Sequence, residues 1–352
     1  MRPYRIVAYG NPSGSKFWRL IDPLKYLRKK GFDAYVSDNG INELEADWAD
    51  IIIVQSCTDK KGIALLYQFQ QEKGKKIVVE VDDFLELNED SPFKHAHDVF
   101  EAQFVISRTM QVADAVTTTT DFLALQLVRY NKNVKVLPNY IDEDRWNLPN
   151  LPNTTDRIRI GWAGSITHVE DVRMIERPIR LICKEFPQVQ LIIVGDPRVA
   201  EIFKGLPVDN QLGVPFEAWP SKLRSLRLDI GLAPLRKTLF NQCKSNIKWI
   251  EYSIAGIPGV YSPTIYNDIG TKHFDGIYGM IAENQEQWYR CIKNYIISPE
   301  LREDIAGRAL SCVTTGYTFK TGIKKWVKFY RQLISKENSD IKSELPAQAA
   351  NT

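Results

Sequence analysis

The chain has 352 residues, of which 44% are hydrophobic and 25% are charged. Its 46 basic and 43 acidic side chains leave a formal net charge of +3. This composition excludes a disordered chain, a collagen-like chain and a small disulfide scaffold, and the near balance of charge argues against a dedicated nucleic-acid coat. The length predicts two domains of ordinary size.

Short β-branched runs alternate with longer segments of helical pattern, of which 17–30 and 63–73 are examples. This alternation predicts βαβ units with parallel sheets, and the nearly continuous apolar runs indicate strands that are covered on both faces. A first series of expected strands covers residues 5–9, 34–37, 51–55, 77–81, 115–118 and 134–137, and a second series covers 158–162, 190–194, 230–233 and 259–262.

A Pro- and Asn-rich stretch, NLPNLPNTTD at residues 147–156, separates the two series and is typical of a linker. We therefore expect an N-terminal α/β lobe over residues 1–150, a C-terminal lobe over 151–335 and a polar, flexible tail over 336–352. Residues 1–153 carry 19 basic and 22 acidic side chains, and the remainder carries 27 and 21. The positive excess in the second lobe is compatible with an anionic ligand there.

The five cysteines and four histidines are scattered along the chain, with no CxxC or HExxH pattern. They predict reduced thiols in a cytoplasmic protein and give no reason to expect a metal site. No apolar run reaches the length that spans a membrane, and the N-terminus enters a strand pattern without the apolar core of a signal peptide.

Two loops follow strands of the first lobe. In YGNPSGSKFW, Gly10 and Gly14 flank a turn where backbone and a helix N-terminus could approach an anion, although a plain strand-to-helix turn has the same pattern. In EVDDF, Asp82 and Asp83 follow an apolar strand, where ligands of open parallel sheets bind. These carboxylates could bind sugar hydroxyls, act as a base or hold a divalent cation, or one could cap the next turn.

The second lobe opens with IRIGWAGSITHVEDV, in which Gly164 and Ser165 lie in a turn between a strand and a helix. Small residues at such a turn expose backbone N–H groups to a phosphate. His168 and Asp171 fall near the helix start, where an acidic side chain is favourable in any case and a lone histidine is more often structural.

A later segment, FNQCKSNIKWIEYSIAGIPGVYS at 240–262, predicts a helix with a buried stripe and a polar face. Lys244, Lys248, Glu251 and Ala255 are spaced to share that face. Two ammonium groups near a helix N-terminus could bind a diphosphate, and a carboxylate one turn later could accept hydrogen bonds from a ribose diol. The alternative is a surface pair between Lys248 and Glu251.

The whole chain, over about residues 4–335, resembles retaining GT-B glycosyltransferases of the family 4 type. The blocks that carry the resemblance occur in the expected order: ADAVTTTTDFLALQL, VKVLPNYIDEDRW, IRIGWAGS, LIIVGDP and DIGLAPL…FNQCKSNIKWIEYSIAGIPGV. The KSxxK pattern before the EY pair is similar to a bacterial and phage-encoded subset. The resemblance implies an α/β GT-B fold, in which two Rossmann-like lobes with parallel sheets face each other across a cleft. The acceptor would bind to the first lobe and the donor nucleotide to the second. The last helix of the second lobe can cross back to the first lobe.

The resemblance also implies roles for individual residues. Glu251 matches the second glutamate of the family's E-x7-E motif, which binds the ribose, whereas the first glutamate is replaced by Cys243. Lys244 and Lys248 are assigned the phosphate charge, and Asp82 or Asp83 the orientation of sugar or acceptor. The remaining donor-binding positions are Gly10, Gly14, Gly164, Ser165 and His168 near the phosphates, Gly195 and Asp196 near the nucleotide, Pro215 and Phe216 near the base, and Asn241 and Ser245. Asn139 matches a turn that we interpret as structural.

The expected activity is transfer of a hexose or pentose from a UDP-, GDP- or similar sugar to an acceptor hydroxyl, with retention and without a metal or other cofactor. The acceptor stays open between a glycan, a lipid-linked sugar and a modified DNA base, the last typical of phage enzymes. A lipid acceptor would favour peripheral membrane contact, for which 17–30 is a candidate. The alternatives are a nucleotide-sugar-binding protein without activity and a two-lobed solute-binding protein, which usually carries a secretion signal.

Overall fold

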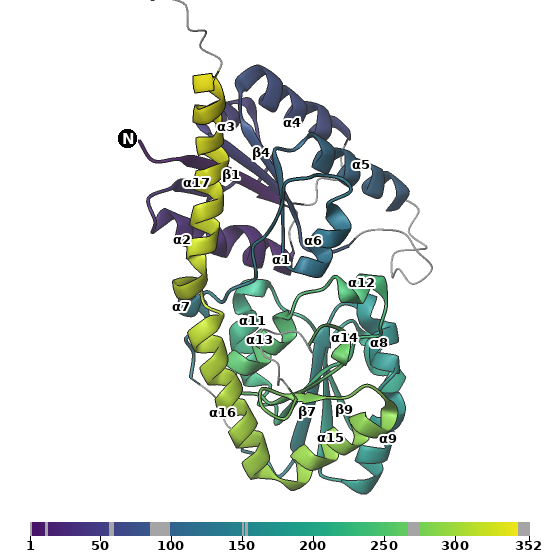
Figure 1. The fold of residues 1–352 in the computed structure, drawn as a ribbon. Coiled ribbons are helices and arrows are strands. Elements are labelled where there is room, and N and C mark those ends of the chain that lie inside the picture. The colour runs from purple at the N-terminus through teal and green to yellow at the C-terminus, as the bar shows by residue number, and fades with distance from the viewer. Residues whose placement is uncertain are drawn as a thin grey trace, which may run out of the picture. The chain divides into compact units, whose positions relative to one another are not determined.

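The computed structural model describes residues 2–10, 13–55, 60–84, 99–149, 151, 154–266 and 275–343. The chain divides into two compact α/β units (Figure 1). Unit 1 comprises Met1–Asp82, Phe100–Pro138 and Phe319–Thr352, and unit 2 comprises Asp83–Val99 and Asn139–Thr318.

Unit 1 is built on a parallel sheet of six strands in the order β2-β1-β3-β4-β5-β6. The strands are β1 Arg5–Gly10, β2 Asp33–Val36, β3 Ile51–Gln55, β4 Lys76–Val81, β5 Ala115–Thr118 and β6 Val134–Val136. The strand order reverses between β1 and β3, which are neighbours. The helices are α1 Gly14–Lys16, the π-helical turn η1 Phe17–Ile21, α2 Asp22–Arg28, α3 Glu43–Trp48, α4 Lys60–Lys73, α5 Val99–Val112, α6 Asp121–Leu127 and α17 Phe319–Ser343.

Arg19, on the π-helical turn, anchors the first helical segment to the sheet. It is 1% exposed, and its Nε and Nη2 donate to the carboxylate of Glu80 at 2.7 and 3.1 Å. Thr117 Oγ1 donates to the same carboxylate at 2.5 Å, and the Trp326 ring of α17 lies 5.0 Å from the guanidinium carbon. A buried ion pair needs such extra hydrogen bonds to offset its loss of hydration. The last helix is thereby tied to the core of unit 1.

The apolar side chains of residues 17–30 pack inside unit 1. Trp18, Leu20, Leu24 and Leu27 are at most 3% exposed, so the apolar face that suggested a membrane contact is used for packing. In the part of the chain that is described, no helix is long and apolar enough to cross a membrane.

Unit 2 repeats the architecture with a parallel sheet in the order β12-β11-β10-β7-β8-β9. The strands are β7 Ile158–Gly164, β8 Val189–Gly195, β9 Val208–Gln211, β10 Ile230–Ala233, β11 Gly259–Tyr261 and β12 Met280–Ile281. The helices are α7 Glu143–Trp146, η2 Ile166–His168, α8 Val169–Arg173, α9 Glu176–Glu185, α10 Pro197–Ala200, η3 Glu201–Phe203, η4 Phe216–Ala218, α11 Trp219–Ser225, α12 Leu239–Gln242, α13 Ile247–Ile254, α14 Pro263–Tyr266, α15 Gln285–Ile297 and α16 Pro299–Gly316.

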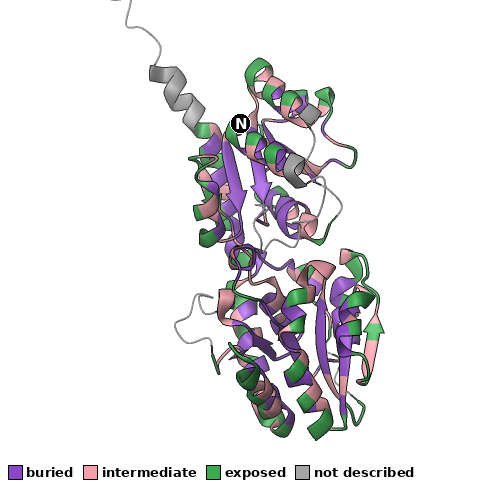
Figure 2. Ribbon diagram, turned by 90° about the vertical axis from the view of Figure 1, so that its right-hand side faces the viewer, coloured by how far each residue is buried: buried purple, intermediate pink, exposed green. Residues whose placement is uncertain are grey.

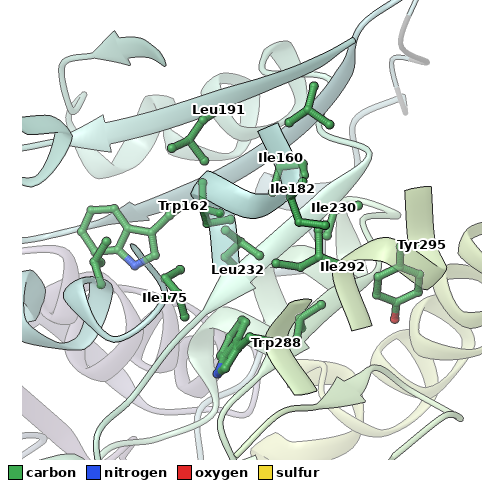
Figure 3. Close-up of a cluster of buried hydrophobic side chains, with 14 of the residues drawn as sticks. Ile160, Trp162, Ile175, Ile182, Leu191, Ile230, Leu232, Trp288, Ile292 and Tyr295 are labelled. Atoms are coloured by element: carbon green, nitrogen blue, oxygen red, sulfur yellow. The ribbon is translucent and has the colours of Figure 1, made fainter. Parts of the chain in front are cut away.

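The core of unit 2 lies between its central strands and the helices α9 and α15. Ile160, Leu191 and Leu232 from three neighbouring strands meet Trp288 and Ile292 of α15 there (Figure 3). The central strands are buried, whereas the edge strand β9 is partly exposed (Figure 2). Because parallel strands are covered on both faces, ligands can reach them only at their ends.

All ten expected strands are confirmed: three have the expected ends, and the ends of the others differ by one or two residues. The two strands that the sequence did not indicate are β9, whose sequence VDNQ lacks an apolar run, and β12, which has 2 residues. The units divide after Pro138, whereas the sequence suggested a limit near residue 150. Helix α17 lies in unit 1, as a last helix that crosses back would, and it continues to Ser343, into the expected tail. Residues 344–352, and 150, 152 and 153 of the expected linker, lie outside the described residues.

Candidate functional site

The carboxyl ends of β7 and β10 mark the point in unit 2 where the strand order reverses. Loops on opposite sides of the sheet diverge at such a point, which makes it the usual ligand site of open α/β sheets. The segment from Gly164 to His168 follows β7, and Arg236 and α12 follow β10. Gly164, Ser165, His168 and Asn241 of the predicted donor site are therefore brought together by the topology of one sheet.

Two glycines end the adjacent strands β7 and β8 in register with each other. Gly195 has a φ of +134°, and a Cβ atom there would lie 2.1 Å from the carbonyl oxygen of Gly164. A Cβ on Gly164 would lie 2.6 Å from the indole of Trp162. The two positions thus require glycine, and they leave the backbone at this edge of the sheet without side chains.

Gly195→Ala should destabilise unit 2 strongly, because alanine meets both an unfavourable φ and a backbone carbonyl. We expect a loss of about 3 kcal/mol, and hence a melting temperature lower by about 6–12 °C. The control is Gly213→Ala, at an exposed glycine without positive φ and with no atom within 4 Å of the added Cβ. Equal melting temperatures of the two variants in a calorimetric scan would contradict the strain argument.

Asp171 is the hub of a hydrogen-bond network that joins the β7 and β10 loops. Its side chain is 5% exposed. Oδ2 lies 2.9 Å from Nδ1 of His168, and Oδ1 accepts from the backbone N–H of Arg236 at 2.9 Å and from Nδ2 of Asn241 at 2.8 Å. Because a carboxylate only accepts, Nδ1 of His168 carries a proton and donates it to Asp171.

Asp171 was not among the predicted site residues, although its sequence signal was present. His168 and Asp171 are separated by three positions at a helix start, which places both side chains on one face. What the sequence could not show is that Asp171 is buried and that the β10 loop, 65 residues further along, supplies its other partners.

The two lysines of the segment 240–262 lie on different elements, so the expectation that they share one helix face is wrong. Helix α13 begins at Ile247, and Lys244 and Ser245 precede it in the connection from α12. Lys244 Nζ lies 3.1 Å from Oδ1 of Asp83 and 4.2 Å from the centre of the Phe240 ring. Lys244 is therefore placed by a loop rather than by helical periodicity.

Lys248 and Glu251 lie on α13 and pair with each other. Lys248 Nζ is 2.8 Å from Oε2 of Glu251, and the ammonium lies 5.4 Å from the centre of the Trp219 ring. The Glu251 side chain is only 4% exposed, while that of Lys248 is 31% exposed. The Lys248–Glu251 pair of the alternative interpretation is thus present, with a buried carboxylate and a partly exposed ammonium group. Cys243, where the family motif has a glutamate, is fully buried.

Ser245 and Asp196 have partners within the protein. Ser245 Oγ accepts from Nδ2 of Asn139 at 2.9 Å, so the turn at Asn139 is connected to the lysine segment. Asp196 caps α10, and its contacts with the Arg198 side chain and backbone lower the pKa of that carboxyl to about 2. Asp196 is therefore an ionised helix cap. Its negative charge would repel a phosphate group and disfavours burial deeper in the site.

Pro215 and Phe216 begin the 3₁₀ turn η4 before α11. Pro215 is exposed and Phe216 is half-buried, with the guanidinium carbon of Arg145 lying 5.8 Å from the centre of its ring. An exposed proline beside an aromatic ring offers a flat apolar surface on which a planar base can stack. Their contact with a base stays a prediction.

In unit 1, the carboxyl ends of β1, β3 and β4 bring Gly10, Gln55 and Asp82 together. Gln55 Nε2 donates to Oδ1 of Asp82 at 3.1 Å. A Cβ on Gly10 would lie 2.8 Å from Oε1 of Gln55, so packing inside unit 1 already requires this glycine. Gly14 is exposed and begins α1. The adjacent carboxylates have different partners, because Asp82 accepts from Gln55 whereas Oδ1 of Asp83 lies 3.1 Å from Nζ of Lys244.

Nothing in the described part of the chain gathers three or more His, Cys, Asp or Glu side chains that could hold a metal ion. At the carboxyl edge of the unit 2 sheet, imidazole, ammonium and backbone N–H groups suit an anion.

No protein-family model matches the chain, and no curated protein sequence matches it either. Solved structures do match. HepE from Anabaena, in complex with UDP and glucose, is 12% identical with a TM-score of 0.66, over 94% of this chain and 100% of HepE. Sucrose-phosphate synthase from Thermosynechococcus elongatus has the same identity, TM-score and coverage. TarM from S. aureus, in complex with UDP among other ligands, is 14% identical with a TM-score of 0.59, over 89% of this chain and 58% of TarM.

The chain has the GT-B fold. Two parallel six-stranded sheets with flanking helices, predicted from the alternation of strands and helices, are confirmed. At 12–14% identity the likeness to these proteins establishes the fold alone. Within this GT-B chain, the predicted donor residues of unit 2 fall into three groups: the network around Asp171, the lysine segment 244–251 and the turn at Phe216.

Proposed function

We propose that this protein is a glycosyltransferase of the retaining, family 4 type, which moves a sugar from a nucleoside-diphosphate sugar to an acceptor hydroxyl. The observation that carries the proposal is the hydrogen-bond network around Asp171 at the strand-order reversal of unit 2, where α/β sheets bind ligands. Structural neighbours crystallised with UDP or UDP-glucose support it. The proposal includes a cytoplasmic location, free or peripheral to a membrane.

The diphosphate would bind unit 2 through backbone and side-chain donors. The bare backbone at Gly164 lets a phosphate approach the N–H groups of the following turn. His168 presents Nε2, and Lys244 and Lys248 supply ammonium groups that do what a divalent cation does in other transferases. Glu251 would accept hydrogen bonds from the ribose diol. In this proposal neither a metal nor another cofactor is needed.

Retention follows if the acceptor attacks from the face that the diphosphate leaves. The leaving phosphate then takes the proton from the acceptor hydroxyl, and the bond from the anomeric carbon to the phosphate oxygen breaks as the new glycosidic bond forms. The protein's contribution is to stabilise the charge that develops on the diphosphate, chiefly through Lys244, Lys248 and His168. Asp82 or Asp83 would orient the sugar or the acceptor hydroxyl.

A thermal-shift screen with UDP, GDP, ADP and dTDP should reveal the nucleotide. A nucleotide at 100 times its dissociation constant adds about 2.7 kcal/mol to the free energy of unfolding. We expect one of the four nucleotides to raise the melting temperature. When the protein is incubated with sugar conjugates of that nucleotide, we expect free nucleotide to be released. If none of the four raises the melting temperature, the protein does not bind a nucleotide and the proposed function is wrong.

A second candidate is a UDP-sugar epimerase, because a structure described as a UDP-N-acetylglucosamine 2-epimerase from Listeria monocytogenes matches 99% of this chain with a TM-score of 0.57. A third candidate is a nucleotide-sugar-binding protein without turnover, suggested by Cys243 in place of a glutamate.

Chromatography of the products separates the three candidate functions. Free nucleotide with a glycosylated acceptor indicates transfer, an altered nucleotide sugar indicates epimerisation, and unchanged substrate indicates binding alone. A glycan, a lipid-linked sugar and a duplex with modified bases are the acceptors to compare.

A further inference from the structure

Four polar side chains form a continuous hydrogen-bond chain at the carboxyl edge of the unit 1 sheet. Ser13 Oγ lies 2.9 Å from Ser15 Oγ, Gln55 Nε2 donates to Ser15 Oγ at 3.0 Å, and the same amide donates to Oδ1 of Asp82 at 3.1 Å. Ser13 is exposed, whereas Gln55 is 3% exposed. The chain thus runs from the surface to the end of the sheet, and Gln55 is its only buried amide.

Gln55 sets the direction of two hydrogen bonds in this chain. Because the carboxylate of Asp82 only accepts, the NH₂ group of the amide must face it, and its two hydrogens go to Asp82 and Ser15. Ser15 Oγ therefore accepts from the amide, and either hydroxyl can donate in the contact between Ser15 and Ser13. Ser13 Oγ also accepts from the backbone N–H of Lys16 at 3.3 Å.

The arrangement leaves the other end of the amide unsatisfied. Gln55 Oε1 is buried without a hydrogen-bond partner, against the Cα atom of Gly10. A buried carbonyl oxygen without a partner is unfavourable, and such groups concentrate at functional sites. An apolar side chain of similar size would remove the penalty but could not hold Asp82.

We propose that Gln55 is the positioning residue of the unit 1 site, which holds the Asp82 carboxylate as an acceptor for a polyhydroxylated ligand. The inference rests on the proposed function, in which that ligand is the sugar or the acceptor. A carboxylate held in one orientation accepts from a ligand hydroxyl in a fixed direction. Gln55 itself does not contact the ligand.

The test compares Gln55→Glu with a matched control, Gln70→Glu. Gln70 Nε2 donates to Oδ2 of Asp114 at 3.0 Å, the same pairing at the opposite end of the same sheet. The probe is UDP-glucose, and the readout is the rate of UDP release. Losing the hydrogen bond to Asp82 should lower kcat by about 30-fold, with the KM for UDP-glucose within about threefold, because the nucleotide binds unit 2. The control should stay within about twofold of the wild type.

The pH profile separates positioning from a merely structural role. The introduced carboxylate would face Asp82, and Glu80 is its neighbour in register on β4, paired with Arg19. Two carboxylates at hydrogen-bond distance share a proton as the pH falls, and the shared proton restores a donor to Asp82. The loss of kcat in Gln55→Glu, relative to the wild type at the same pH, should therefore shrink about tenfold between about pH 8 and about pH 5.5. Gln55→Met, which keeps the size but has no donor or charge, should lose as much kcat and show no recovery.

The outcomes are distinguishable. If the wild type releases no UDP and no nucleotide stabilises it, the proposed function is wrong and the assignment of Gln55 falls with it. If the wild type is active and both Gln55→Met and Gln55→Glu match the Gln70→Glu control, only the assignment of Gln55 is overturned. A kcat deficit that is the same at every pH for Gln55→Glu and Gln55→Met would show a structural role instead.

Discussion

Asp171→Asn should lower kcat/KM for the nucleotide sugar by about 100-fold while the protein stays folded. The amide oxygen of asparagine can still accept from the backbone N–H of Arg236 and from Asn241, so the two loops stay joined. The amide NH₂, however, now faces Nδ1 of His168 and donates to it. An imidazolium, which would donate from Nε2 to the diphosphate, then loses the carboxylate that stabilises it.

The size of this effect comes from the burial of Asp171. Its side chain is 5% exposed, so water cannot replace the lost carboxylate beside the imidazole. Glu170→Gln is the matched control, because Glu170 lies on the same helix, is 52% exposed and pairs with Arg173 at 3.3 Å. Exposed pairs contribute little, and the control should behave as the wild type does.

A double variant tests whether Asp171 acts through His168. Residues that form one network are not additive, so Asp171→Asn combined with His168→Gln should be no slower than His168→Gln alone. Steady-state kinetics with the nucleotide identified by thermal shift, and melting temperatures of all four proteins, provide the comparison. Multiplicative losses would show that the two residues act independently, and that Asp171 does not act through His168.

The fold could be predicted because its signals are local. Runs such as IIIVQ and LIIVG specify buried parallel strands, and the glycines and prolines between them mark the ends. The strand ends then place Gly10, Asp82, Gly164 and Ser165 at the carboxyl edges of their sheets, where the sequence predicted them. The edge strand β9 was not predicted, because its sequence VDNQ is polar, which is common for a strand at the edge of a sheet.

The partners within each site could not be predicted, because they depend on contacts between segments far apart in sequence. In the sequence, Gln55 is only the last residue of a strand. Its contact with Asp82, 27 positions later, is visible only in the structure. The burial of Asp171 depends on the loop after β10. Lys244 was placed on a helix because its spacing to Lys248 fits helical periodicity, but α13 begins only at Ile247. Periodicity indicates a face and does not show where the helix starts.

Removing both ammonium groups should abolish turnover and most of the nucleotide affinity. A hydrogen bond to a charged group contributes about 1.5–3 kcal/mol, so Lys244→Ala combined with Lys248→Ala should weaken UDP binding by roughly 10²- to 10⁴-fold. The matched control is Lys293→Ala, whose ammonium pairs with Glu185 at 2.7 Å on the surface of the same unit. Calorimetric titration with UDP gives the dissociation constants, and wild-type affinity and turnover in the double variant would refute the phosphate assignment.

Loss of stability must be separated from loss of binding in this experiment. Without Lys248, the carboxylate of Glu251, which is 4% exposed, loses its partner, and the free energy of unfolding should fall by about 1–3 kcal/mol. Adding Glu251→Gln removes the uncompensated charge, so it should restore the melting temperature of Lys248→Ala. It should not restore UDP binding, because the ammonium group is still absent and the ribose has lost its acceptor. A variant that recovers both stability and UDP affinity would mean that Lys248 only neutralises Glu251 and does not bind phosphate.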